Sequence, residues 1–192
     1  MKNIEIKKEL VKASKKLKEL NLIGLLSGNI SYRKGDIIYI TPSQINKKEL
    51  KPNNISEIDI NGNILNKIKP SSEYRLHLEI YKKRKDINTI IHTHPPYTIA
   101  FSVSKLKPDF NLTVEFKILV NNIEFCDFKK PGTQELAQKA AEKSKYSDVI
   151  ILKNHGLVVL SQSIQKGIII SEEVENFFKI NFIVFILKNL KR

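Results

Sequence analysis

Two histidines lie one residue apart in the stretch TIIHTHPP, which spans residues 89–96. The whole sequence of 192 residues has four histidines, so this pair accounts for half of them. The apolar run before the pair predicts a β-strand, in which residues i and i+2 point to the same face. His92 and His94 are therefore expected to offer two imidazoles to one divalent transition metal ion, zinc above all. The alternative is a strand end that is merely polar and exposed.

A third histidine, His155, occurs in VIILKNHGLVVL between two apolar runs that predict buried strands. A polar break between core strands is costly unless its polar groups are used, and Gly156 is expected to let the backbone turn sharply there. Taken alone, His155 fits a hydrogen-bonded turn as well as a metal ligand. With His92 and His94 it completes a three-histidine set with an open position, which is typical of catalytic zinc. The fourth histidine, His77, is interpreted as a packing or surface residue and not as a ligand.

The stretch KPSSEYRLHLEIY predicts a helix that starts after Pro70. Ser71 or Ser72 is expected to cap this helix, and hydroxyls with free N–H groups at a helix start form an anion site. Glu73 follows in the first turn, where it either complements the helix dipole or faces the metal as a base. The spacing leaves both interpretations open.

Two loops resemble further anion sites. LLSGNISY places Ser27, Gly28 and Asn29 just before a predicted strand, and ITPSQI places Thr41, Pro42 and Ser43 just after one. Small hydroxyl residues with glycine or proline are also ordinary turn residues, so each loop is weak evidence by itself.

The elements that must position these residues alternate between helices and strands. Helices are predicted for residues 4–20 (ended by Gly24), 71–84, 97–105, 132–145 (capped by Thr133) and from 163 onward; hairpins for 29–43 and 56–66; and strands for 87–94 and 148–161. Residues 108–130 are left unassigned. This order predicts an α/β sandwich with a mostly antiparallel or mixed sheet, formed by residues 1–192 as a single domain.

Composition restricts the possible classes of protein. Hydrophobic residues make up 41% and charged residues 28%, as in an ordinary soluble globular domain. One cysteine, Cys126, excludes an internal disulfide and indicates the reducing cytoplasm. The charged N-terminal stretch predicts no secretory signal, and no apolar run is long enough to predict a transmembrane span. We therefore expect a cytoplasmic protein with no membrane partner.

The net charge of +13 allows nucleic acid, an anionic surface or an anionic small substrate as partner. The lysines are spread along the chain, and the one dense group, YKKRK at 81–85, is typical of the solvated end of a helix. Aromatic residues do not alternate with the basic ones, and no nucleic-acid-binding motif is present. The sequence therefore favours a small anionic substrate over nucleic acid.

Five motifs in order, SGNIS, ITPSQI, KPSSE, IIHTHPP and LKNHGLVVL, resemble the class II aldolase/adducin family, in particular its L-fuculose-1-phosphate aldolase branch. The resemblance covers about residues 5–188. It implies an α/β/α sandwich and a homotetramer with active sites between subunits. In the second motif, Gln44 stands where the family usually has glycine.

The resemblance also implies roles for individual residues. His92, His94 and His155 match the ligands of one Zn²⁺ per subunit, and Glu73 matches the acid/base residue, which can also touch the metal. The positions that match the phosphate site are Gly28, Asn29, Ser43, Gln44, Ser71 and Ser72. The implied reaction is reversible cleavage of a ketose 1-phosphate to dihydroxyacetone phosphate and an aldehyde such as lactaldehyde.

Other functions remain open within the same family. A sugar-phosphate 4-epimerase typically carries aspartate after the two serines, so Glu73 favours the aldolase, whereas a methylthioribulose-1-phosphate dehydratase keeps a similar glutamate. An adducin-like binding module would have lost the three histidines. Manganese, iron or cobalt can replace zinc in a three-histidine site.

Overall fold

The structure of the protein is a computed structural model, and it describes residues 2–190. At its centre is a seven-stranded sheet in the order β3-β2-β1-β4-β7-β6-β5. The strands are β1 (Asn29–Lys34), β2 (Ile37–Ile40), β3 (Ser56–Asp59), β4 (Thr89–Thr93), β5 (Glu124–Cys126), β6 (Val149–Leu152) and β7 (Gly156–Ser161). All neighbours are antiparallel except β5 and β6, which run parallel. The predicted α/β fold with a mostly antiparallel sheet is confirmed.

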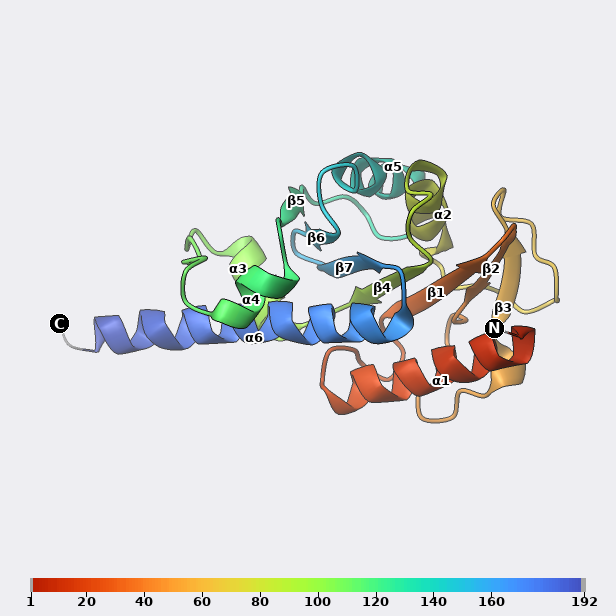
Figure 1. The fold of residues 1–192 in the computed structure, drawn as a ribbon, viewed down its shortest axis with the longest axis horizontal. Coiled ribbons are helices and arrows are strands. Elements are labelled where there is room, and N and C mark those ends of the chain that lie inside the picture. The colour runs from red at the N-terminus through yellow and green to blue at the C-terminus, as the bar shows by residue number, and fades with distance from the viewer. Residues whose placement is uncertain (1, 191–192) are drawn as a thin grey trace.

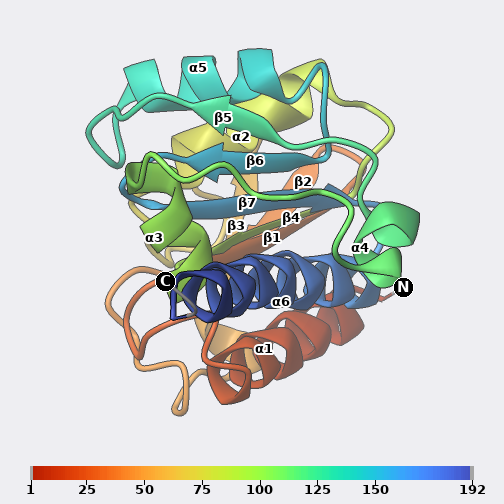
Figure 2. The same cartoon turned by 90° about the vertical axis from the view of Figure 1, so that its left-hand side faces the viewer.

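Helices cover both faces of the sheet, which makes a three-layer sandwich (Figure 1, Figure 2). They are α1 (Asn3–Glu19), α2 (Tyr74–Lys83), α3 (Pro96–Val103), α4 (Val114–Leu119), α5 (Gln134–Lys143) and α6 (Ile164–Asn189), with a short 3-10 helix at Pro52–Asn54. Helices α2 and α5 lie on one face, and α1 and α6 lie on the other. Because side chains alternate along a strand, Ile90 and Ile91 of β4 enter separate apolar clusters.

Two details of the predicted elements need correction. The first helix spans Asn3–Glu19, within one residue of the predicted 4–20, but Asn21 and not Gly24 ends it: Asn21 takes a left-handed conformation with φ of 58°, a conformation that asparagine tolerates. The second predicted hairpin is present in a shorter form: β3 is its first arm, and its second arm pairs only through an antiparallel bridge between Ile58 and Ile64 and the hydrogen bond from Leu65 N–H to the Glu57 oxygen at 2.7 Å. Gly62, in the turn between the arms, has a positive φ of 90°.

The unassigned segment 108–130 contains α4 and β5. Phe116 of α4 is buried, and its ring stacks on Phe177 of α6 with 3.9 Å between the centroids. Only six residues form α4, so its apolar side chains show no helical period that the sequence could reveal. The partner α6 fixes this segment.

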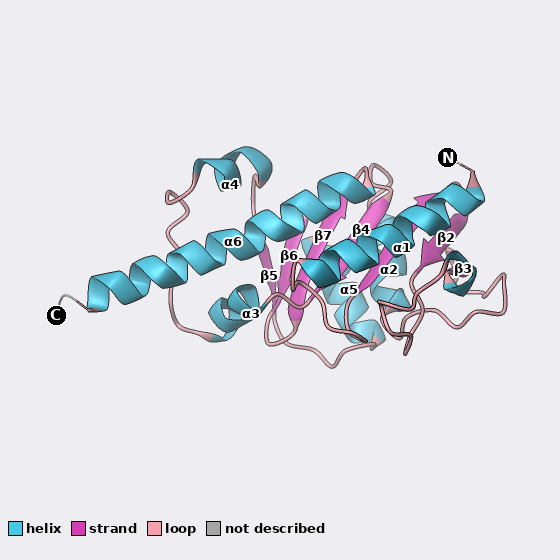
Figure 3. Ribbon diagram, turned by 90° about the horizontal axis from the view of Figure 1, so that it is seen from below, coloured by secondary structure: helices cyan, strands magenta, loops and turns pink. Residues whose placement is uncertain are grey.

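Helix α6 has 26 residues, and Figure 3 shows its C-terminal half extending past the sheet. Several large apolar side chains are exposed on this half: Ile180, Phe182, Ile183, Phe185, Ile186 and Leu187. Even so, within residues 2–190 no helix combines the length and apolar content that a membrane crossing requires.

One lysine is buried without an acidic partner, and this predicts a measurable effect on stability. Lys47 is 1% exposed, and burial lowers its pKa to about 8. Below pH 8 both the folded and the unfolded chain keep the proton, so the folded state carries the full cost of a buried charge. Lys47→Met removes that charge at similar volume, and is expected to raise the free energy of unfolding at pH 7 by up to about 3 kcal/mol.

The pH dependence gives a second readout of the same variant. Between about pH 8 and pH 10.5 the folded wild type releases the Lys47 proton before the unfolded chain does, so its stability rises with pH. The advantage of Lys47→Met should therefore shrink between guanidinium titrations at pH 7 and pH 10. The neighbouring Lys48 is exposed, and Lys48→Met should change neither value. A Lys47→Met protein less stable than wild type at pH 7 would contradict the interpretation.

Candidate metal centre and active site

The two histidines of the IHTH motif lie side by side at the end of β4. Their Nε2 atoms are 2.9 Å apart. The His92 ring is completely buried, and its Nδ1 lies 3.0 Å from the carbonyl oxygen of Leu157 on β7. Because a carbonyl oxygen only accepts hydrogen bonds, Nδ1 carries the hydrogen in this contact. In neutral His92 the lone pair is therefore on Nε2, which faces the cluster. The backbone N–H of His94 donates to Leu22 at 2.8 Å, and this contact fixes the end of the strand.

The turn between β6 and β7 brings His155 to the same place. Its Nε2 lies 3.3 Å from Nε2 of His92. The sharp turn that was expected at Gly156 is made at Asn154, which has a positive φ of 61°, whereas the φ of Gly156 is not positive. Gly156 instead provides space: a Cβ there would lie 2.3 Å from the Thr93 oxygen and 3.0–3.1 Å from the rings of His94 and His92. The glycine lets β7 lie directly against the histidine pair.

Glu73 joins the three imidazoles from the start of α2. Its Oε2 lies 3.0 Å from Nε2 of His92 and 3.2 Å from the amide nitrogen of Asn29, and its Oε1 lies 3.4 Å from Nε2 of His155. The expected serine cap is absent, because Glu73 itself occupies the N-cap position and no side chain caps the helix. Ser71 Oγ instead accepts the backbone N–H of Glu73 at 3.3 Å. The carboxylate is thus aimed into the site and not along the helix.

The electrostatics of the cluster favour a cation. Burial alone would raise the pKa of Glu73, but the neighbouring histidines, His92 first, hold it well below the usual range. Burial, reinforced by His92, lowers the pKa of His94 to about 3 and that of His155 to about 4. Burial opposes protonation of His92 too, but the Glu73 carboxylate outweighs it and raises the pKa of His92. Two imidazoles are therefore neutral and ready to bind a metal at physiological pH.

The donor set fits a divalent metal ion. One ligand atom from each of Glu73, His92, His94 and His155 lies within 4.8 Å of the others. Among residues 2–190, the buried Oε1 of Glu73 makes no hydrogen bond. Zinc with imidazole bonds of about 2.0–2.1 Å separates tetrahedral ligand atoms by about 3.3 Å, close to the spacing of these nitrogens. His77 is buried on α2 and lies outside this cluster.

The predicted anion loops meet beside the cluster. A cavity of about 490 Å³ is lined by Glu73, His94 and His155, together with every position of the predicted phosphate site: Gly28, Asn29, Ser43, Gln44, Ser71 and Ser72. Ser43 Oγ accepts the backbone N–H of Ser72 at 2.8 Å, and a bridge between Pro42 and Pro70 joins the two loops.

Two features of this cavity were not predicted. Lys69 also lines it, and its position directly before Pro70 and the two serines could have predicted this placement. Gln44 has a φ of 60°, in the left-handed region that favours glycine. The backbone therefore keeps a conformation suited to glycine, even though the chain has a side chain at this position.

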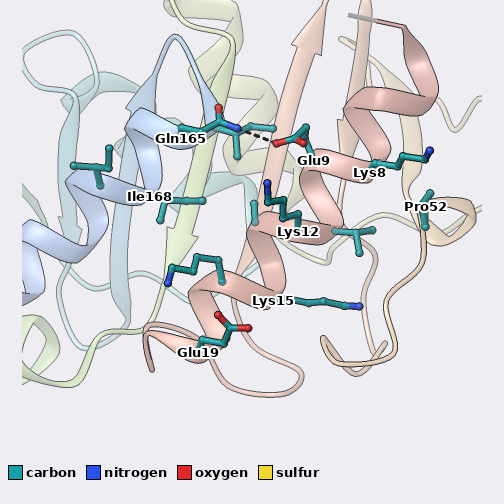
Figure 4. A pocket seen from close by; sticks show the side chains of 13 residues that line it. Lys8, Glu9, Lys12, Lys15, Glu19, Pro52, Gln165 and Ile168 are labelled. Carbon is teal, nitrogen blue, oxygen red and sulfur yellow. Dashed lines mark hydrogen bonds between the residues drawn. The ribbon is translucent and has the colours of Figure 1, made fainter.

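A larger cavity, of about 730 Å³, lies between α1 and α6. Figure 4 shows lysines around it and the hydrogen bond of 2.9 Å from Gln165 to Glu9. No member of the histidine–glutamate cluster lines it. The smaller cavity is therefore the candidate active site.

Comparison with known proteins agrees with this site. The family described as Class II Aldolase and Adducin N-terminal domain matches residues 8–182. An L-fuculose phosphate aldolase of Methanocaldococcus jannaschii is 38% identical over 183 residues, which cover 95% of this chain and 98% of that one. A 5-methylthioribulose-1-phosphate/5-deoxyribulose-1-phosphate aldolase of Rhodospirillum rubrum is 31% identical over 173 residues, covering 90% and 78%. A solved L-fuculose 1-phosphate aldolase superposes with a TM-score of 0.87 at 32% identity, covering 98% of this chain and 88% of that one.

The chain therefore belongs to the class II aldolase and adducin family, as its motifs predicted. It is an enzyme of the lyase class, a class II aldolase, and within the family it is similar to the L-fuculose phosphate aldolases.

Proposed function

We propose that this protein is a zinc-dependent aldolase that reversibly cleaves a ketose 1-phosphate, similar to L-fuculose 1-phosphate, into dihydroxyacetone phosphate and an aldehyde such as lactaldehyde. One observation carries the proposal: three imidazole nitrogens and a carboxylate converge at the wall of a cavity that small hydroxyl residues also line. His92, His94 and His155 hold one Zn²⁺ per subunit, and Glu73 can also touch it. A bound zinc ion supplies a Lewis acid beside the substrate oxygens.

The residues around the cavity bind and orient the phosphate. Gly28, Asn29, Ser43, Gln44, Ser71 and Ser72 form its site. Ser43 and Ser71 accept backbone hydrogen bonds in the free protein, so the hydroxyl hydrogen of each is available to a phosphate oxygen. Anchoring the phosphate holds the reacting carbons against Glu73, which lowers the entropic part of the barrier.

Glu73 moves the proton of the reaction. In cleavage, the proton of the substrate hydroxyl passes by way of water to the ionised Glu73, and the carbon–carbon bond breaks, which releases the aldehyde and leaves an enediolate of dihydroxyacetone phosphate. Glu73 then delivers one proton to the enediolate carbon, and in synthesis it removes that proton. Its lowered pKa keeps the carboxylate ionised in the resting protein, so it is free to accept a proton.

The assembly and location follow from the same family. We propose a homotetramer with active sites at subunit interfaces, and the exposed apolar side chains of the C-terminal half of α6 support a partner subunit. We place the enzyme in the cytoplasm, where the buried free thiol of Cys126 stays reduced. Nucleic acid and membranes are not proposed as partners.

A second candidate exists for the half of the substrate that is released as the aldehyde. The relative from Rhodospirillum rubrum is named as an aldolase of methylthioribulose and deoxyribulose 1-phosphates, so such ketose phosphates belong in the substrate panel. The presence of Glu73 disfavours the 4-epimerase, and the intact ligand cluster disfavours an adducin-like binding module. A methylthioribulose-1-phosphate dehydratase remains the alternative within the family, and it would release water in place of an aldehyde.

The test is to load the purified protein with zinc and incubate it with dihydroxyacetone phosphate and a panel of aldehydes, with products identified by mass spectrometry. We expect a ketose 1-phosphate product that disappears after treatment with a chelator and returns when zinc is restored. Manganese-, iron- and cobalt-loaded samples identify the most active metal. Absence of product with every metal would contradict the proposed function.

A further inference from the structure

A row of polar side chains connects β1 with α2 and ends at Glu73. Residues two apart share a face of a strand, and residues four apart share a face of a helix. The strand contributes Asn29, Ser31 and Arg33, and the helix with its N-cap contributes Glu73, His77 and Tyr81. The polar residues therefore form one row along the strand and one row along the helix, and the two rows face each other inside the protein.

The contacts form a continuous chain of hydrogen bonds. Asn29 Nδ2 lies 3.2 Å from Glu73 Oε2, and Asn29 Oδ1 contacts Nε2 of His77. Nδ1 of His77 lies 2.7 Å from Oγ of Ser31, and Ser31 Oγ lies 2.9 Å from the Tyr81 hydroxyl. His77 is completely buried. The ring therefore has two partners and no access to water.

The states of Glu73 and His77 set the direction of the hydrogen bonds from Glu73 to Ser31; the Tyr81 hydroxyl beyond them also donates to the carbonyl oxygen of Asn88 at 3.0 Å. The ionised carboxylate of Glu73 only accepts, so Asn29 must turn its NH₂ group toward Glu73 and its carbonyl toward His77. Burial, reinforced by His92, lowers the pKa of His77 to about 3, so the ring is neutral. Nε2 of His77 must then carry the single hydrogen, which it donates to Asn29, and Nδ1 accepts from the hydroxyl of Ser31.

We propose that His77 is a positioning residue of the aldolase site, which acts on Glu73 through Asn29. Its Nε2–H holds the Asn29 carbonyl and so keeps the Asn29 NH₂ group on the carboxylate. If the amide turned over, its carbonyl oxygen would face Glu73 and repel it. The inference rests on the proposed role of Glu73 as the acid/base residue.

The simpler alternative is that the chain only satisfies buried polar groups. The two explanations differ in what the ring must supply. A structural role needs a side chain that fills the space and keeps the protein folded. The positioning role needs a hydrogen-bond donor at the place of Nε2. Glutamine can place an N–H there, whereas leucine fills much of the space and donates nothing.

The experiment compares His77→Leu and His77→Gln with wild type in the zinc-loaded protein. We expect His77→Leu to lower kcat about 10- to 100-fold, as for other residues that orient a ligand through a hydrogen bond. The bound zinc should stay unchanged, and because Asn29 also belongs to the phosphate site, the KM for the sugar phosphate should rise by a smaller factor than kcat falls. His77→Gln should recover most of kcat. Ser14→Ala, which removes a buried hydrogen bond in α1 far from the site, controls for loss of stability.

A second measurement needs neither activity nor a variant. The protein has only four histidines, so ¹⁵N-histidine labelling resolves every ring by NMR. The His77 ring, assigned through its contacts with Ser31 and Asn29, is expected to be the neutral Nε2–H tautomer, with that hydrogen protected from exchange. The result should be the same before and after zinc is added.

The outcomes separate the two hypotheses. If wild type has no aldolase activity, the proposed function fails, and the tautomer alone decides the direction of the hydrogen bonds. If wild type is active and His77→Leu keeps its kcat, the positioning role is overturned and the proposed function stands. An equal loss of kcat in His77→Leu and His77→Gln, or an Nδ1–H tautomer in wild type, also overturns it.

Discussion

Glu73→Gln is expected to lower kcat by about 10²- to 10⁴-fold, the usual contribution of a general acid or base. Glutamine has nearly the same shape, but its amide takes no proton from the substrate carbon at neutral pH. The three histidine nitrogens are unchanged, so zinc should remain bound at wild-type stoichiometry. Steady-state cleavage of the best ketose phosphate, with metal analysis of the same sample, measures both quantities.

The matched control for this variant is Glu79→Gln. Glu79 lies on α2, the helix that begins at Glu73, but its carboxylate pairs with Lys82 at 2.8 Å and not with the cluster. We expect Glu79→Gln to keep the wild-type kcat. A Glu73→Gln enzyme with full activity would show that another group moves the proton.

Gly156→Ala is expected to have the second largest effect, a loss of metal affinity of at least about 100-fold. The new methyl group would lie 2.3 Å from the Thr93 oxygen, so β7 and β4 must move apart near the histidines. Misplacing a catalytic group by about 1 Å can cost about 100-fold in rate, and we expect a metal whose ligands shift by as much to lose affinity by a similar factor. Titration with cobalt, whose absorption reports the ligand geometry, measures the affinity and shows whether all three imidazoles still bind.

Gly35→Ala separates this local effect from general destabilisation. Gly35 has a φ of +57°, so alanine is strained there, but apart from its two chain neighbours no other part of residues 2–190 lies within 4 Å of the added carbon. The turn that contains Gly35 joins β1 to β2 and contributes no residue to the cluster. We expect Gly35→Ala to lower stability and leave cobalt affinity unchanged. Equal loss of affinity in both variants would contradict a specific role for Gly156.

The sequence predicted those parts of the fold in which a local pattern reports a local structure. The hairpin predicted for residues 29–43 is formed by β1 and β2, and Thr133 predicted the start of α5, where its hydroxyl accepts from the backbone N–H of Leu136. The segment 108–130 escaped prediction, because α4 depends on the contact of Phe116 with a helix 60 residues away in sequence. Long-range packing of this kind leaves no period in the chain.

In the candidate site, too, local patterns could be predicted from the sequence and long-range contacts could not. Strand periodicity predicted that His92 and His94 share a face, but it left the position of His155 open, since that depends on the pairing of β4 with β7. Gly156 was predicted to allow a sharp turn, but its importance is the space that it leaves between β4 and β7. The sequence of one strand does not show how closely the next strand approaches it. His77 was interpreted as packing, and its two hydrogen bonds emerge only when β1 and α2 are placed together.

The location of the cluster has a consequence for how substrate preference can change. Two of the histidines are anchored by β4 and its neighbour β7, which lie in the interior of the sheet and are held by partners on both sides. The cavity lining outside the metal and phosphate sites includes connecting segments, such as those that carry Leu26 and Pro131. Segments of this kind tolerate replacement far better than interior strands do. Substitutions in these connecting segments can therefore change which aldehyde is accepted, while the histidine–glutamate cluster stays in place.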